Sequence, residues 1–262
     1  MPNVNVDGCQ IHYEVAGEGE PLLMLSGLGG AGRAWGQLTN MLAEHYLTIV
    51  PDHRGTGASD VPAAGYTIEQ HAADMAAVLS AVDCGPAHVL GSSTGGAIAQ
   101  QMALDHRSVT RSILLADSWA KPDDFFRHQF AARKRILLEA GPELYAATSA
   151  LVLFSPQFFR DHYDQVAAWV AASGGGPRDP QVMAKRIDMI VEFDESRRLG
   201  AIDVPALVLV GDGDACTPPY FSEELARLIP NARYEVLAGG HLIYKEAPEA
   251  VFAAVHEFIS GS

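Results

Sequence analysis

The chain has 262 residues, 48% of them hydrophobic and 19% charged, a composition that suits one compact globular domain with an elaboration. Its 32 acidic residues outweigh 18 basic ones and give a formal net charge of −14, without any sustained basic stripe. This balance argues against nucleic acid and against an anionic membrane surface as partners.

Two further features concern the compartment. The N-terminal residues lack the charged start and apolar stretch of a secretory signal, and no apolar run reaches the roughly 18 residues of a membrane span. The three cysteines, an odd number at unrelated spacings, argue against a disulfide framework and against a zinc site. We therefore expect a cytoplasmic protein that binds no metal. The sequence leaves its oligomeric state open, a homodimer included.

Short apolar runs alternate with helix-like segments up to Ser118. Residues 4–6 and 10–15 resemble two strands joined by a hairpin turn at Asp7-Gly8. Further strands are expected at 21–26, 47–50, 89–90 and 113–116, and helices at 33–44, 68–82 and 97–104. This alternation predicts right-handed βαβ units and a mainly parallel sheet.

The alternation stops between residues 121 and 198, where helix-like segments are rich in aromatic residues and broken at Gly and Pro. It resumes with strands at 206–210 and 234–237 and helices at 222–228 and 247–259. We therefore predict an α/β core formed by residues 1–120 and 199–262. A helical cap (lid) of residues 121–198 follows the sixth strand, and its glycine-rich stretch 173–176 is expected to be its most mobile part.

The motif Gly91-x-Ser93-x-Gly95 lies between the short apolar run at 89–90 and the predicted helix 97–104. This arrangement fits a sharp strand-to-helix turn that holds its serine in strained backbone geometry and lifts the hydroxyl clear of the sheet. A glycine at either flank avoids a collision of a Cβ with the neighbouring strand or helix. The free N–H groups of the following helix favour developing negative charge.

Candidate partners for this serine follow two later strands. An acidic loop with Asp212 and Asp214 comes after the strand at 206–210, and His241 follows two glycines after the strand at 234–237. Ligands bind at the carboxyl ends of strands in open α/β sheets. The chain order Ser…Asp…His is the one found in α/β-hydrolases. The pattern predicts a catalytic triad, with either aspartate as the acid.

These motifs together resemble the α/β-hydrolases with a small cap domain, over essentially the whole chain. The nearest likeness is to 3-oxoadipate enol-lactone hydrolases and aminoacrylate hydrolases. The resemblance is carried by Ser26-Gly27-Leu28-Gly29-Gly30, Asp52-x-Arg54-Gly55-x-Gly57-x-Ser59, the Ser93 motif, Gly211-x-x-Asp214-x-x-x-Pro218 and Gly240-His241. In this family the first of these motifs commonly begins with His-Gly. Here it begins with Ser26-Gly27, which changes a supporting residue. The sequence around Ser93 is also similar to cofactor-free perhydrolases, so the branch stays open.

The resemblance implies roles for individual residues. Ser93 would be the nucleophile, His241 the base that takes its proton, and Asp214 the carboxylate that orients the imidazole, with Asp212 as the alternative acid. The oxyanion would accept hydrogen bonds from the backbone N–H groups of Thr94 and Leu28.

Several other positions are interpreted beside these motifs. Gly27 and Trp119 are expected to line the pocket. Asp52 and Arg54 are interpreted as a structural pair within one loop. The basic run 133–135 could attract an acidic substrate, but a solvated helix face is the favoured interpretation.

The sequence therefore predicts a cofactor-independent serine hydrolase that cleaves a small ester or lactone through an acyl-enzyme. The alternatives are an aminoacrylate-type or carbon–carbon bond hydrolase and a perhydrolase. A non-catalytic receptor on the same fold is the alternative from a different class. The only partner predicted is a small-molecule substrate, and its identity is not encoded in these motifs.

Overall fold

The computed structural model describes residues 2–172, 176–177 and 179–261. The expected mobility of stretch 173–176 concerns residues 173–175, which lie outside the described residues. One eight-stranded sheet has the strand order β1-β2-β4-β3-β5-β6-β7-β8. The strands are β1 (Asn3–Val6), β2 (Cys9–Ala16), β3 (Glu20–Leu25), β4 (Tyr46–Pro51), β5 (Ala87–Ser92), β6 (Thr110–Ala116), β7 (Ala206–Gly211) and β8 (Arg233–Leu237).

Only the first two strand pairings of this sheet, β1 with β2 and β2 with β4, are antiparallel. The pairings from β4 through β3, β5, β6 and β7 to β8 are parallel. The mainly parallel sheet and the N-terminal hairpin predicted from the sequence are thus confirmed. Because neighbouring parallel strands end at the same edge, the loops after β3, β5, β6, β7 and β8 meet there.

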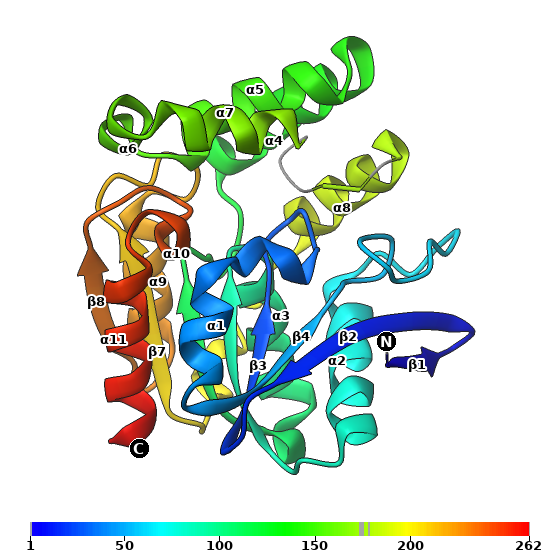
Figure 1. Ribbon diagram of the computed structural model, residues 1–262, viewed down its shortest axis with the longest axis vertical. Helices are drawn as coiled ribbons and strands as arrows, with labels where there is room; N and C mark the ends of the chain where they lie inside the picture. The colour runs from blue at the N-terminus through cyan, green and yellow to red at the C-terminus, as the bar shows by residue number, and fades with distance from the viewer. Residues whose placement is uncertain (1, 173–175, 178, 262) are drawn as a thin grey trace.

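The helices fall into two groups. Those of the core are α1 (Gln37–Ala43), α2 (Ile68–Val82), α3 (Thr94–Asp105), α9 (Pro219–Leu228), α10 (Ile243–Glu246) and α11 (Pro248–Ser260). Those between β6 and β7 are α4 (Asp124–Ala140), α5 (Pro142–Leu153), α6 (Pro156–Asp161), α7 (Tyr163–Ala171) and α8 (Pro180–Glu192). Figure 1 shows α4 to α7 above the carboxyl ends of the strands, with α1 and α11 in front of the sheet and α3 behind it.

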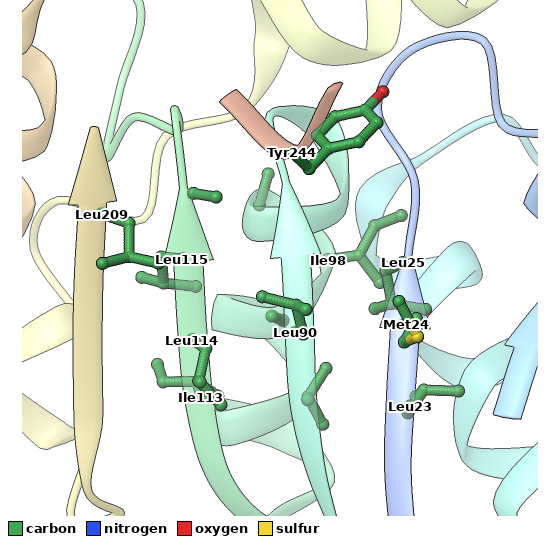
Figure 2. Close-up of a cluster of buried hydrophobic side chains, with 14 of the residues drawn as sticks. Leu23, Met24, Leu25, Leu90, Ile98, Ile113, Leu114, Leu115, Leu209 and Tyr244 are labelled. Carbon is green, nitrogen blue, oxygen red and sulfur yellow. The ribbon is translucent and has the colours of Figure 1, made fainter. Parts of the chain in front are cut away.

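The central strands are apolar because both faces of the sheet are covered. Every residue of β5 and of β7 is buried. Figure 2 shows the side chains of β3, β5, β6 and β7 forming one cluster with Ile98 of α3, while Tyr244 lies above it at the strand ends. Burial of this kind stabilises the fold by roughly 25 cal/mol per Å² of apolar surface. It provides a rigid platform for the loops at that edge.

Two helices differ from the sequence prediction. The segment predicted as one helix over 33–44 is divided at Gly36, whose φ of 57° interrupts it between a short 3-10 turn and α1. Helix α3 begins at Thr94, directly after the serine, rather than at residue 97. In the part of the chain that the structure describes, no helix is long and apolar enough to cross a membrane.

Candidate active site

Ser93 occupies the strained turn that the sequence predicts. Its φ of 54° and ψ of −115° lie in a region that a residue with a side chain rarely adopts. A Cβ on Gly91 would come within 2.2 Å of the Gly95 oxygen, and one on Gly95 within 2.0 Å of the Leu25 oxygen. Both glycines are therefore required by the close approach of β5, α3 and β3. The Ser93 N–H donates to the Ala116 oxygen at 2.8 Å, which ties the turn to the end of β6.

His241 and Asp214 form a buried pair. Nδ1 of His241 lies 2.8 Å from Oδ2 of Asp214, and the two side chains are 3% and 0% exposed. Such a pair holds the imidazole with its proton on Nδ1 and leaves Nε2 as an acceptor.

The carboxylate of Asp214 is fixed by its own loop. Oδ1 accepts from the N–H groups of Cys216 at 2.8 Å and of Thr217 at 2.9 Å. The Thr217 hydroxyl lies 2.8 Å from Oδ2. By contrast, the Asp212 carboxylate accepts from the Gly239 N–H at 3.0 Å, in an exposed contact. Of the two candidate acids, Asp214 is the one whose carboxylate contacts the histidine.

Asp117 is a supporting residue that the sequence reasoning missed. It follows β6 with a φ of 52°, and its Oδ1 accepts from the Gly211 N–H at 2.9 Å. Its main-chain oxygen accepts from the Thr217 hydroxyl at 2.9 Å. Burial, and next the neighbouring Asp214 charge, raise the pKa of Asp117 well above its usual value. Its position directly after the predicted strand 113–116, at the edge where the candidate site lies, could have identified it from the sequence.

The loop that carries Gly27 and Leu28 lies against the serine. A Cβ on Gly27 would come within 3.4 Å of the Ser93 Cβ, so this glycine lies directly beside Ser93. The loop turns on itself through a Gly30 N–H that donates to the Gly27 oxygen at 2.9 Å. Thr94 is the first residue of α3, where backbone N–H groups have no partner within the helix.

A buried arginine of α8 holds this loop from behind. Arg186 of α8 donates from Nε to the Leu28 oxygen at 2.8 Å. Its Nη1 and Nη2 lie 2.9 Å from Nε2 of His71 and 3.0 Å from Nδ1 of His53. Burial lowers the pKa of Arg186 to about 10, which still leaves it charged at neutral pH. Burial and this neighbouring charge lower the pKa values of His53 and His71, which stay neutral acceptors.

The segment between β6 and β7 also contacts the loop that carries His241. Glu246 accepts from the Gly240 N–H at 3.0 Å and from the Ser155 N–H at 2.8 Å. The Leu242 N–H donates to the Leu153 oxygen at 3.1 Å. Two loops of the candidate site are therefore positioned by segments that lie between β6 and β7.

One cavity, partly open to solvent, joins these parts. Its volume is about 80 Å³, enough for a compact molecule in place of a few waters. Core residues in its wall include Gly27, Leu28, Ser93, Cys216, His241 and Tyr244. The segment between β6 and β7 contributes Phe130, Arg133, Tyr145, Ala146, Ser149, Leu153, Trp169 and Met183 to the wall. The structure thus brings Ser93 and His241 to one space, which residues of α4, α5, α7 and α8 also line.

Two sequence expectations are placed differently. Trp119 is not part of this wall; it is fully buried in the core, with its ring centroid 4.8 Å from that of Phe126. Arg54 does not pair with Asp52 but with Asp74 of α2, through two bonds of 2.6 Å. Asp52 instead accepts from the Gly32 N–H at 2.8 Å. In both cases the contacts expected from nearby motifs are replaced by contacts with residues farther along the chain.

The basic run 133–135 divides into unlike environments. Lys134 and Arg135 pair at the surface with Asp188 and Glu139, as the interpretation of a solvated face expects. Arg133 is 8% exposed and forms part of the cavity wall. In the described part of the chain, no group of three or more His, Cys, Asp or Glu side chains could hold a metal ion.

The α/β-hydrolase family model matches residues 20–248. The chain belongs to the α/β-hydrolase family. It is accordingly a hydrolase, and the resemblance found in its motifs is confirmed at the level of this family.

Individual relatives cover nearly the whole chain. A candidate carbamate hydrolase named RutD, from Azorhizobium caulinodans, is 36% identical over 95% of this chain and 94% of its own. An esterase from Thermogutta terrifontis matches with a TM-score of 0.89 at 28% identity, covering 100% of this chain and 99% of its own. Est816, described as an N-acyl homoserine lactone degrading enzyme, matches with a TM-score of 0.87 at 28% identity, covering 98% and 100%.

Proposed function

We propose that the protein is a cofactor-independent serine hydrolase that cleaves a small ester or lactone, with Ser93, His241 and Asp214 as its catalytic triad. The observation that carries the proposal is the buried contact of 2.8 Å between His241 and Asp214 in a cavity whose wall also contains Ser93. The similarity to an esterase and to a lactone-degrading enzyme supports this substrate class.

The mechanism follows from the chemistry of these groups. His241 accepts the Ser93 proton through Nε2 while the oxygen attacks the substrate carbonyl, and Asp214 stabilises the imidazolium that forms. The proton then passes to the leaving alkoxide, which leaves an acyl group on Ser93. A water molecule, deprotonated by the same histidine, releases the acid and restores the serine.

The negative charge on the carbonyl oxygen needs donors that are already in place. The N–H groups of Leu28 and Thr94 are proposed for this role, because their chain segments flank Ser93 on two sides. Arg186 acts behind Leu28, as a positioning residue for the loop that carries this donor.

Labelling with a fluorophosphonate tests the nucleophile directly. We expect one covalent adduct per chain, located on Ser93 by peptide mass spectrometry, because such probes react with an activated serine. The fraction of chains that carry the label should equal the fraction of p-nitrophenyl acetate hydrolysis that is lost. An unlabelled, inactive protein would favour the non-catalytic receptor, and an adduct on another residue would contradict the assignment.

The small volume of the cavity leads to a second prediction, which concerns the length of the substrate's acyl chain. Across p-nitrophenyl esters from acetate to decanoate, kcat/KM should fall beyond about four acyl carbons, because a cavity of about 80 Å³ cannot enclose a long chain. A groove of the lipase type would give the opposite trend. There, kcat/KM would rise with about 0.8 kcal/mol of binding for each methylene buried.

A carbamate is the second candidate substrate, favoured by the 36% identity to a relative named for that activity. The same triad can attack a carbamate carbonyl, with an amine or ammonia as the leaving group. Release of ammonia from a small carbamate, measured beside release of alcohol from an ester of equal size, decides between the two. The larger kcat/KM identifies the class.

A further inference from the structure

Arg133 is a buried cation in the wall of the candidate catalytic cavity. It lies on α4 of the cap, and its guanidinium carbon is 4.7 Å from the Phe130 ring centroid and 5.3 Å from that of Tyr145. Nη2 donates to the Ser149 hydroxyl at 3.1 Å and approaches the Tyr145 hydroxyl at 3.3 Å. Nη1 lies 3.6 Å from the Cys216 sulfur. These contacts fix the guanidinium beside the cavity.

None of these neighbours carries a negative charge that could balance the arginine. The hydroxyls are neutral, and burial raises the pKa of the Cys216 thiol to about 12. Among the residues that the structure describes, Arg133 forms no ion pair, and its Nε–H is buried without an acceptor. A guanidinium stays charged in proteins, and an unpaired buried charge is costly.

The other buried arginines show what a structural arginine looks like in this chain. Arg54 has the carboxylate of Asp74 on two of its nitrogens. Arg186 has no carboxylate, but all three of its nitrogens have acceptors, and it lies outside the cavity wall. Arg133 alone among these three combines a free donor with a place in the cavity.

We propose that Arg133 recognises a carboxylate on the acyl part of the substrate, a few bonds from the carbonyl that Ser93 attacks. This inference rests on the proposed function, and it names the substrate class of that site. A carboxylate in the cavity would supply the counter-charge that Arg133 lacks, in the same small space as Ser93. The anionic group lies on the acyl side, so it remains in the cavity until the second half of the reaction.

Matched substrates test the proposal. Monomethyl succinate, glutarate and adipate carry a terminal carboxylate, and the corresponding methyl half-amides are neutral molecules of the same shape. Methanol release gives kcat/KM for each, and the ratio of half-acid to half-amide measures charge recognition. We expect a ratio of about 10 to 100 for the best chain length, the range of charge-assisted hydrogen bonds.

Variants assign that ratio to one residue. Arg133→Met should bring it close to one, and Arg133→Lys should retain part of it, because the charge remains but the planar fork is lost. Arg135→Met is the matched control, since Arg135 lies on the same helix but is exposed and paired with Glu139. That variant should keep the ratio of the parent. A ratio near one in the parent, or an unchanged ratio in Arg133→Met, overturns the proposal.

A binding measurement separates this proposal from the proposed function. Calorimetric titration of monomethyl glutarate into Ser93→Ala, and into Ser93→Ala/Arg133→Met, needs no turnover. We expect binding that weakens about 10- to 100-fold when Arg133 is replaced. If Ser93 is not labelled by the fluorophosphonate yet this binding depends on Arg133, only the hydrolytic function fails. If Ser93 is labelled and binding ignores Arg133, only the carboxylate proposal fails.

Discussion

Replacing Ser93 with alanine should lower kcat for p-nitrophenyl acetate by about 10⁴-fold or more while the protein stays folded. Members of a catalytic triad act as a unit, so loss of the proposed nucleophile would remove the whole covalent route and leave only the contribution of binding and the proposed oxyanion donors. The change deletes one oxygen at a turn, and the structural cost should be below about 1 kcal/mol. Residual hydrolysis above a few per cent of the parent rate would contradict the assignment.

A second variant at this position separates chemistry from backbone strain. Ser93→Gly should be as inactive as Ser93→Ala but should unfold at a temperature a few degrees higher. The φ of 54° strains any residue with a Cβ by about 1–3 kcal/mol, and glycine adopts it freely. Part of this gain is offset by the greater freedom of glycine in the unfolded chain. Equal melting temperatures would mean that the turn stores no such strain.

The regular part of the fold could be predicted because its signals are local. Helix α2 has the predicted bounds, residues 68–82, since its apolar positions recur with helical spacing and Thr67 caps its first turn. The central strands are continuous apolar runs, which parallel sheets require. The helix expected over 33–44 was wrong because the conformation of one residue, Gly36, divides it.

The site could be predicted only as far as its residues follow strands. Ser93, Asp214 and His241 all occupy strand-end loops, and their convergence follows from the parallel sheet. The partners of Arg54 and the location of Trp119 depend on segments distant in sequence, which local patterns do not report. The environment of Arg133 could not be foreseen for the same reason. Phe126, Phe130, Arg133 and Leu137 share a buried face of α4, but the polar partners of the guanidinium come from α5 and from the loop of Cys216.

The choice between the two acidic-loop residues gives the second large effect: Asp214→Asn should reduce kcat by about 10⁴-fold, whereas Asp212→Asn should stay within a few-fold of the parent. The reason lies in the loop itself. Oδ1 of Asp214 accepts from two backbone N–H groups, so in the asparagine variant the amide oxygen must take that position. The amide NH₂ then faces Nδ1 of His241 and donates to it, which moves the imidazole proton to Nε2. In that tautomer the histidine cannot accept the serine proton. The Asp212 carboxylate accepts from the Gly239 N–H at the surface, and Asp212 is separated from Asp214 by one residue. Asp212→Asn is therefore a matched control for any disturbance of the loop. The measurement is kcat for p-nitrophenyl acetate in both variants and in Asp214→Asn/Ser93→Ala, where the losses should be far from additive. A larger loss in Asp212→Asn than in Asp214→Asn would place the catalytic acid at residue 212.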